Sequence, residues 1–185
     1  MKKQTVIIGL IIISVLVSLF YLIKPNSKHD AFLSQYDLDQ MSVKEMILSL
    51  EHNLSEPTGF YAGITGKSLT IGDQSKQIEI DLPPNQFYLS IAPYINQTHP
   101  CANHNLVTCR GELKNQTFDV YVEEKSTGKI VFNGQVSSSN NGFLGIWLPS
   151  SKSLEITVSQ NGLEASTSIT TYIDSNTCLT TLKLT

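Results

Sequence analysis

The sequence has few charged residues and no cluster of basic ones. Only 16% of its 185 residues are charged, the formal net charge is −3, and the 13 basic residues are scattered. A nucleic-acid-binding surface needs a basic patch or stripe that neutralises phosphates. Nucleic acid is therefore excluded as an expected partner.

Motifs of several common enzyme classes are also missing. No Gly-x-Ser-x-Gly segment presents a nucleophilic serine, and there is no glycine-rich phosphate loop. The three cysteines include no Cys-x-x-Cys pair, and no βαβ pattern is visible. The sequence thus supports neither a hydrolase nor a thiol–disulfide enzyme.

A long hydrophobic run is present near the N-terminus, from Val6 to Ile23, followed by Lys24 and Pro25. It is long enough to span a bilayer, and it could equally be the core of a signal peptide. No Ala-x-Ala cleavage pattern follows it, and no cysteine at its end could accept a lipid. Because more lysines precede the run than follow it, we predict a signal anchor with a cytoplasmic N-terminus and an exported remainder. A cleaved signal peptide is the alternative.

A helical pattern follows, because apolar residues recur at spacings of three and four between Asp30 and Leu54. Ser42 with Glu45 three residues later is a capping-box signature. The pattern predicts a helix from about Val43 to Asn53, after a shorter helical turn near residues 31–36.

Beyond Gly59 the pattern is β throughout, with short alternating segments separated by turn residues. The predicted strands lie at 68–72, 77–82, 87–95, 117–123, 130–136, 143–148, 154–159, 164–171 and 178–184. Such a series predicts a mainly β (α+β) protein with an antiparallel β-sandwich or small barrel. We divide the chain into a signal anchor and linker (1–29), a helical N-terminal segment (30–58) and a β-rich metal-binding domain (59–185).

Thiols and imidazoles gather in one stretch of the β-rich part. Cys101 and Cys109 lie there with His99 and His104, and a third cysteine, Cys178, follows near the C-terminus. These side chains are soft ligands that suit Cu(I), Zn(II) or iron–sulfur clusters better than calcium or magnesium. The separation of eight residues between the first two cysteines is not that of a common zinc motif. In an oxidising compartment, three cysteines could instead form one disulfide and leave a spare thiol.

Three motifs in this part of the chain occur in a recognisable order. They are His-Pro-Cys-x-x-His-x-Leu-x-Thr-Cys-x-Gly-Glu-Leu at 99–113, Asn-Gly-Phe-Leu-Gly-Ile-Trp-Leu-Pro at 141–149 and Thr-Cys-Leu-Thr-Thr-Leu at 177–182. Together they resemble the CueP family of periplasmic copper-binding proteins, over the chain from about Asp30 to its end. The resemblance implies copper binding outside the cytoplasm, with Cys101, Cys109 and Cys178 at the matching positions.

The resemblance also implies what such a site does. We expect Cu(I) sequestration through the three cysteines, with His104 as a further ligand, His99 as a second candidate, and zinc as the less favoured metal. A role in copper homeostasis would involve a cuproenzyme that receives the copper or a thiol–disulfide oxidoreductase that reduces the site. Self-association of the N-terminal part into a homodimer is a further expectation.

The cysteines could also carry redox chemistry, because two thiols release two electrons when they form a disulfide and could reduce Cu(II) as they bind it. Cys101 and Cys109 are linked by one short loop, so this pair is predicted to oxidise together and then to lose Cu(I). The alternative function is a structural or adhesive β-domain without metal, closed by a Cys101–Cys109 disulfide.

Overall fold

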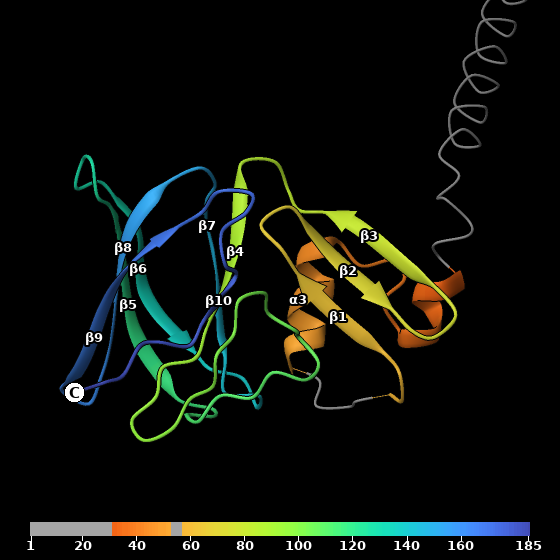
Figure 1. Ribbon diagram of the computed structural model, residues 1–185, viewed down its shortest axis with the longest axis horizontal. Coiled ribbons are helices and arrows are strands. Elements are labelled where there is room, and N and C mark those ends of the chain that lie inside the picture. Colours follow the sequence, from red (N-terminus) through yellow and green to blue (C-terminus); the bar gives the residue numbers. More distant parts are fainter. Residues whose placement is uncertain (1–30, 53–56) are drawn as a thin grey trace, which may run out of the picture. The chain divides into compact units, whose positions relative to one another are not determined.

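The computed structural model describes residues 31–52 and 57–185 (Figure 1). The chain divides into two compact units, Met1–Gln40 and Met41–Thr185. In the first unit, the described residues include the 3-10 helix η1 (Ser34–Tyr36). The hydrophobic run Val6–Ile23 lies outside the described residues, and within 31–52 and 57–185 no helix is long and apolar enough to cross a membrane. The domain boundaries predicted after residues 29 and 58 stay predictions.

The second unit begins with helix α3 (Val43–His52), at the position that the capping box predicts. The backbone N–H of Ser42 donates to the Glu45 carboxylate at 2.7 Å, and the N–H of Glu45 donates back to the Ser42 hydroxyl at 3.4 Å. This reciprocal pair satisfies amide groups that the first turn of a helix otherwise leaves unbonded. The buried face of α3 consists of Met46, Ile47, Leu50 and, unusually for such a face, a glutamate, Glu51.

Ten strands form three sheets among the described residues of this unit. The first is antiparallel and consists of β1 (Tyr61–Ile64), β2 (Ser68–Gly72) and β3 (Gln77–Asp81). The second has the order β10-β4-β7, with β4 (Gln86–Ile91), β7 (Leu144–Pro149) and β10 (Cys178–Leu179). The third has the order β6-β5-β8-β9, with β5 (Thr117–Glu124), β6 (Ile130–Ser137), β8 (Ser153–Gln160) and β9 (Leu163–Thr170).

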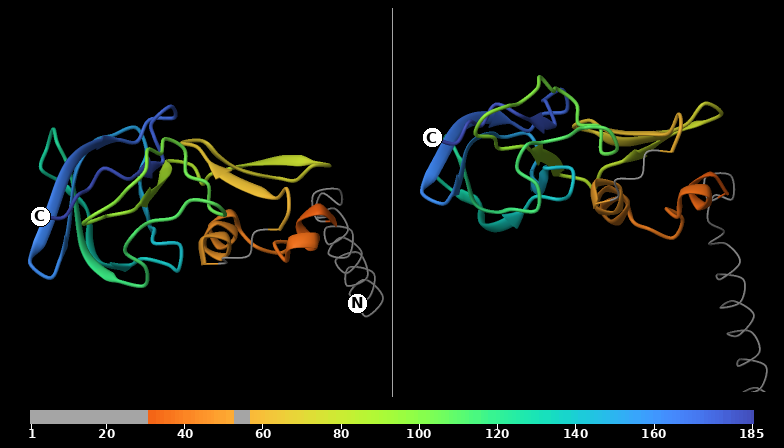
Figure 2. Two further views of the ribbon diagram at one scale, coloured as in Figure 1. Left: turned by 60° about the horizontal axis from the view of Figure 1, so that its bottom comes forward. Right: turned by 90° about the horizontal axis from the view of Figure 1, so that it is seen from below.

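The second and third sheets enclose one hydrophobic core, as the two layers of a sandwich do (Figure 2). Alternate residues of the central strands point into it: Phe87, Leu89, Ile91, Phe118, Val120, Val122, Leu154, Ile156 and Val158. The predicted mainly β fold is confirmed, and the strand order of each sheet is linear. Helix α3 lies beside the first sheet (Figures 1 and 2).

The second sheet is mixed rather than purely antiparallel, which corrects the predicted pairing. Strand β10 runs parallel to β4, with Cys178 opposite Ser90, whereas β4 and β7 are antiparallel. A parallel pair needs a long connection, and here most of the sandwich separates the two strands in the sequence. This pairing places Cys178 next to β4, the central strand of the second sheet.

Candidate metal centre

The long loop that carries Cys101 and Cys109 is fixed between β1 and the segment that precedes β10. The amides of Thr177 and Cys178 both donate to the Ala102 carbonyl, at 3.0 and 3.1 Å. The amide of His104 donates to the Thr177 hydroxyl at 3.1 Å, and the His104 carbonyl accepts from Ile64 of β1 at 2.9 Å. Backbone hydrogen bonds therefore bring the first and third sequence motifs together.

The ligand atoms of Cys101, His104, Cys109 and Cys178 all lie within 4.8 Å of one another. These are the three cysteines and the preferred histidine of the predicted site, brought together from a loop and the start of β10. His99 is not in this group; its ring lies 6.2 Å from that of Phe143, centroid to centroid. The role of the four grouped residues as metal ligands stays a prediction. The geometry favours His104 over His99 as the histidine ligand.

A disulfide joins Cys101 to Cys178, with their α-carbons 5.6 Å apart, and Cys109 is the free thiol. The predicted Cys101–Cys109 disulfide is therefore wrong, although the two sulfur atoms are only 3.9 Å apart. The prediction relied on closeness in the sequence. In the fold, the hydrogen bonds to the Ala102 carbonyl hold Cys178 beside Cys101. The Cys109 thiol is oriented by a short turn in which the Cys109 amide donates a hydrogen bond to the Asn105 carbonyl.

His104 is fully buried and is contacted on three sides. Its ring packs on Phe143 with a centroid distance of 4.3 Å, and its Nδ1 lies 3.7 Å from the Cys178 sulfur. Its Nε2 lies 3.1 Å from an oxygen of Glu51, a close contact whose direction departs from that of a well-formed hydrogen bond. One ring nitrogen thus faces the sulfur atoms and the other faces a carboxylate.

The charges in this cluster support one another. Burial alone would lower the pKa of His104, but hydrogen bonds and charges of Cys109 and Glu51 outweigh it and raise that pKa. Burial would raise the pKa of the Cys109 thiol, but the hydrogen bonds from His104 and the Asn105 backbone, with the charges of His104 and Arg110, lower it. The thiol outside the disulfide is therefore held toward the thiolate form, which is the form that binds metals.

Two glycines allow the loop after Cys109 to approach the second motif. The amide of Gly111 donates to the Asn141 carbonyl at 2.6 Å, and a Cβ on Gly111 or Gly142 would overlap the backbone of the other. Gly142 also has a φ of +82°, which strains any residue with a side chain. The second motif is thereby placed so that Phe143 packs against His104.

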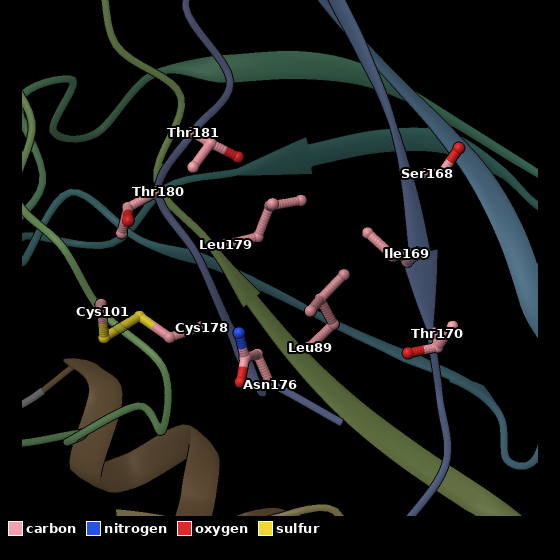
Figure 3. A pocket seen from close by; sticks show the side chains of 10 residues that line it. All are labelled: Leu89, Cys101, Ser168, Ile169, Thr170, Asn176, Cys178, Leu179, Thr180 and Thr181. Atoms are coloured by element: carbon pink, nitrogen blue, oxygen red, sulfur yellow. A yellow bond between two sulfur atoms is a disulfide. The ribbon is translucent and has the colours of Figure 1, made fainter. Parts of the chain in front are cut away.

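A pocket of about 230 Å³ borders the disulfide. Figure 3 shows the Cys101–Cys178 bond at its margin, with Leu89 of β4 and Ile169 of β9 on another part of its wall. Side-chain hydroxyls, including those of Thr170 and Thr180, make the lining partly polar. The pocket offers small solutes a way to the disulfide, whereas His104 has no exposed surface.

The same residues connect the chain to known proteins. The family described as "Periplasmic copper-binding protein CueP" matches residues 45–183. The chain belongs to the CueP family. A crystal structure described as "Crystal Structure of S.CueP" is 37% identical to it with a TM-score of 0.81, and the match covers 88% of this chain and 100% of that chain. No curated protein sequence matches. Membership in the CueP family supports copper as the metal and a location outside the cytoplasm.

Sequence reasoning missed the side chains that surround His104 in this CueP-family protein. Glu51 comes from α3 and Phe143 from the segment before β7, and neither carries a ligand motif. A signal for Glu51 does exist in the sequence, because it follows Leu50 on the face of the helix that the apolar pattern assigns to the core. A charged residue on such a face needs partners, and here they include the hydroxyls of Tyr88 and Ser90 and the close contact with His104.

Proposed function

We propose that the protein binds Cu(I) outside the cytoplasm through the thiolates of Cys101, Cys109 and Cys178, with His104 as a further ligand. The observation that carries the proposal is the convergence of these four ligand atoms within 4.8 Å. Sulfur and imidazole donors suit a soft d¹⁰ ion, and Cu(I) is favoured over Zn(II) because the family is a copper-binding one. The three-thiolate site forms only after the Cys101–Cys178 disulfide is reduced.

The disulfide also suggests a redox reaction, in which Cys101 and Cys178 reduce Cu(II) to Cu(I). Two Cu(II) ions would each accept one electron while Cys101 and Cys178 lose two protons and form their S–S bond. The product, a disulfide beside the free Cys109 thiol, is the state that the chain has here. A thiol–disulfide oxidoreductase would then restore the thiols, and a cuproenzyme would receive the copper. Homodimer formation through residues 30–58 stays a prediction.

The test is an anaerobic competition titration of Cu(I) between the purified full chain and a chromophoric chelator. The reduced protein should bind Cu(I) at least about 100-fold more tightly than Cys109→Ser, because losing a ligand should exceed the 10–100-fold effect of losing an outer partner. The matched control is His52→Ala, which removes an exposed imidazole whose Nδ1 contacts the Leu48 carbonyl and should leave the affinity unchanged.

Other results would favour other functions. If the reduced chain and Cys109→Ser bound Cu(I) equally, the three-thiolate site would be wrong and the Cys101–Cys178 bond would be a structural cross-link. A Zn(II) affinity that fell with each cysteine, while Cu(I) affinity did not, would favour zinc as the metal. Oxidised protein should bind Cu(I) more weakly than reduced protein, because a disulfide sulfur is a poor ligand beside a thiolate.

Retention at the membrane is part of the proposal and is supported by the sequence of Val6–Ile23 alone. The copper-binding unit would then lie at the outer face of the cell membrane, with a cytoplasmic N-terminus. We expect the mature chain to sediment with membranes. A mature N-terminus between Ser18 and Asp30, found by mass spectrometry, would contradict the anchor and leave export intact.

A further inference from the structure

Glu51 is the one buried carboxylate among residues 31–52 and 57–185, with 3% of its surface exposed. It does not belong to the group of four ligand atoms, and it comes from an element, α3, that carries none of them. A buried charge costs several kcal/mol unless partners satisfy it, so its presence calls for a reason.

Three groups from two parts of the chain, β4 and the loop that carries His104, surround this carboxylate. The Tyr88 hydroxyl donates to Oε2, and the Ser90 hydroxyl donates to Oε1 at 3.1 Å. Both come from β4 and point to the same side of the strand. The third group is Nε2 of His104, 3.1 Å from Oε1.

The fold makes room for this arrangement. A Cβ on Gly145 of β7, which lies opposite Ser90, would overlap the Tyr88 hydroxyl and come within 2.9 Å of Oε2 of Glu51. Burial, followed by the charge and hydrogen bond of Glu51, raises the pKa of Tyr88 well above its ordinary value, so the phenol stays a neutral donor. Glu51 therefore has a fixed position and two fixed donors.

The geometry has a consequence for the imidazole. An ionised carboxylate only accepts hydrogen bonds, and a neutral imidazole has one N–H and one lone pair. Both oxygens of Glu51 already accept hydrogen bonds, so a lone pair on Nε2 would face an accepting oxygen at 3.1 Å and be repelled, and Nε2 therefore carries the hydrogen. Nδ1, which lies 3.7 Å from the Cys178 sulfur and faces the sulfur atoms while the ring is charged, is then the nitrogen that is bare when the ring is neutral. Metal-binding histidines commonly have their second nitrogen fixed by a carboxylate in this way.

We propose that Glu51 is a positioning residue that keeps the hydrogen of His104 on Nε2, so that Nδ1 is the nitrogen that bonds to Cu(I). This inference rests on the proposed Cu(I) site and assigns a role to a residue outside it. Tyr88 and Ser90 hold the carboxylate in place, and Gly145 leaves the space that they need.

The test reads the two ring nitrogens of His104 directly, by ¹⁵N NMR of the reduced full chain at a pH where the ring is neutral. The wild-type protein should show a protonated Nε2 and a bare Nδ1. One equivalent of Cu(I) should shift the Nδ1 signal and leave Nε2 protonated. A protonated Nδ1 before metal is added, or a Cu(I)-dependent shift of Nε2 instead, would overturn the proposal.

Two variants separate positioning from a merely structural role. Glu51→Leu keeps the volume and removes the acceptor, so the hydrogen should redistribute toward Nδ1 and Cu(I) affinity should fall about 10–100-fold. Glu51→Gln keeps an acceptor oxygen and should retain the wild-type tautomer. If Glu51→Leu kept both the wild-type tautomer and the wild-type affinity, the proposal would be wrong. If Glu51→Leu does not fold, the ¹⁵N spectra of wild type and Glu51→Gln still test which ring nitrogen of His104 carries the hydrogen.

The outcomes distinguish this proposal from the proposed function. Absence of Cu(I) binding by the reduced wild-type chain would overturn both. Tight Cu(I) binding with no change at Nδ1 would leave the cysteine site standing and overturn only the role of Glu51. The Tyr88→Phe variant adds a control, because it removes one donor to the carboxylate while Glu51 itself remains, and it should keep the tautomer.

Discussion

At the scale of single residues, Glu112 fixes the start of the loop that precedes the cysteines. Its carboxylate accepts hydrogen bonds from the amides of Ile95 and Asn96, at 2.7 and 3.0 Å, and from the Asn96 side chain at 3.0 Å. These backbone hydrogen bonds, which favour the ionised form, lower its pKa to about 2 from an ordinary 4.5. Glu112, near the end of the first motif, is thus connected to the residues that precede this motif.

This shift predicts a pH dependence of stability. Because the pKa in the folded chain is below that in the unfolded chain, the stabilisation is complete above about pH 4.5 and is lost as the pH falls toward about 2. The free energy of unfolding should therefore decrease more steeply over this range in wild type than in Glu112→Gln. Urea denaturation at a series of pH values measures the difference, which should be constant above the range. Parallel curves throughout would contradict the role of Glu112.

At the scale of elements, the helix and most strands could be predicted from the sequence. The capping box places the start of α3 correctly, and β2 has the predicted bounds, because local hydrogen bonding and alternation are properties of a short stretch. Strand β1 was missed: its four residues, Tyr61–Ile64, include a glycine and give too short an alternation. It forms because β2 pairs with it.

The predicted last strand, 178–184, shows where local reasoning ends. Only Cys178–Leu179 forms a ladder, and it does so in parallel with β4, a pairing that the alternation of residues cannot reveal. The correct disulfide depends on that pairing, since it places Cys178 beside the loop of Cys101. The ligand types could be read from the sequence, whereas the partner of each sulfur and the carboxylate behind His104 required the fold.

At the scale of the second unit, the disulfide joins positions 77 residues apart. Closing a loop of that length restricts the unfolded chain and contributes about 4.5 kcal/mol in the loop-entropy estimate. The cross-link ties the loop of Cys101 to β10, and hence to the sandwich core that β4 shares. Reduction, which the proposed Cu(I) site requires, removes this cross-link.

Cu(I) should replace the lost cross-link, because its ligands come from the same two segments and binding to the folded state alone stabilises it. Free Cu(I) at about 1,000 times its dissociation constant would contribute about 4 kcal/mol, close to what the disulfide contributes. We therefore expect the free energy of unfolding to fall when the metal-free protein is reduced and to recover when Cu(I) is added. Denaturant unfolding of the three forms under identical conditions measures both steps.

The Cys109→Ser variant is the matched control for this exchange of cross-links. It keeps Cys101 and Cys178, so it should lose about the same free energy of unfolding on reduction as wild type does. It lacks the third thiolate, so the same Cu(I) concentration should restore less stability than in wild type. If Cu(I) left reduced wild type as unstable as the metal-free form, or restored Cys109→Ser equally, copper would not be joining these segments through the three sulfur atoms.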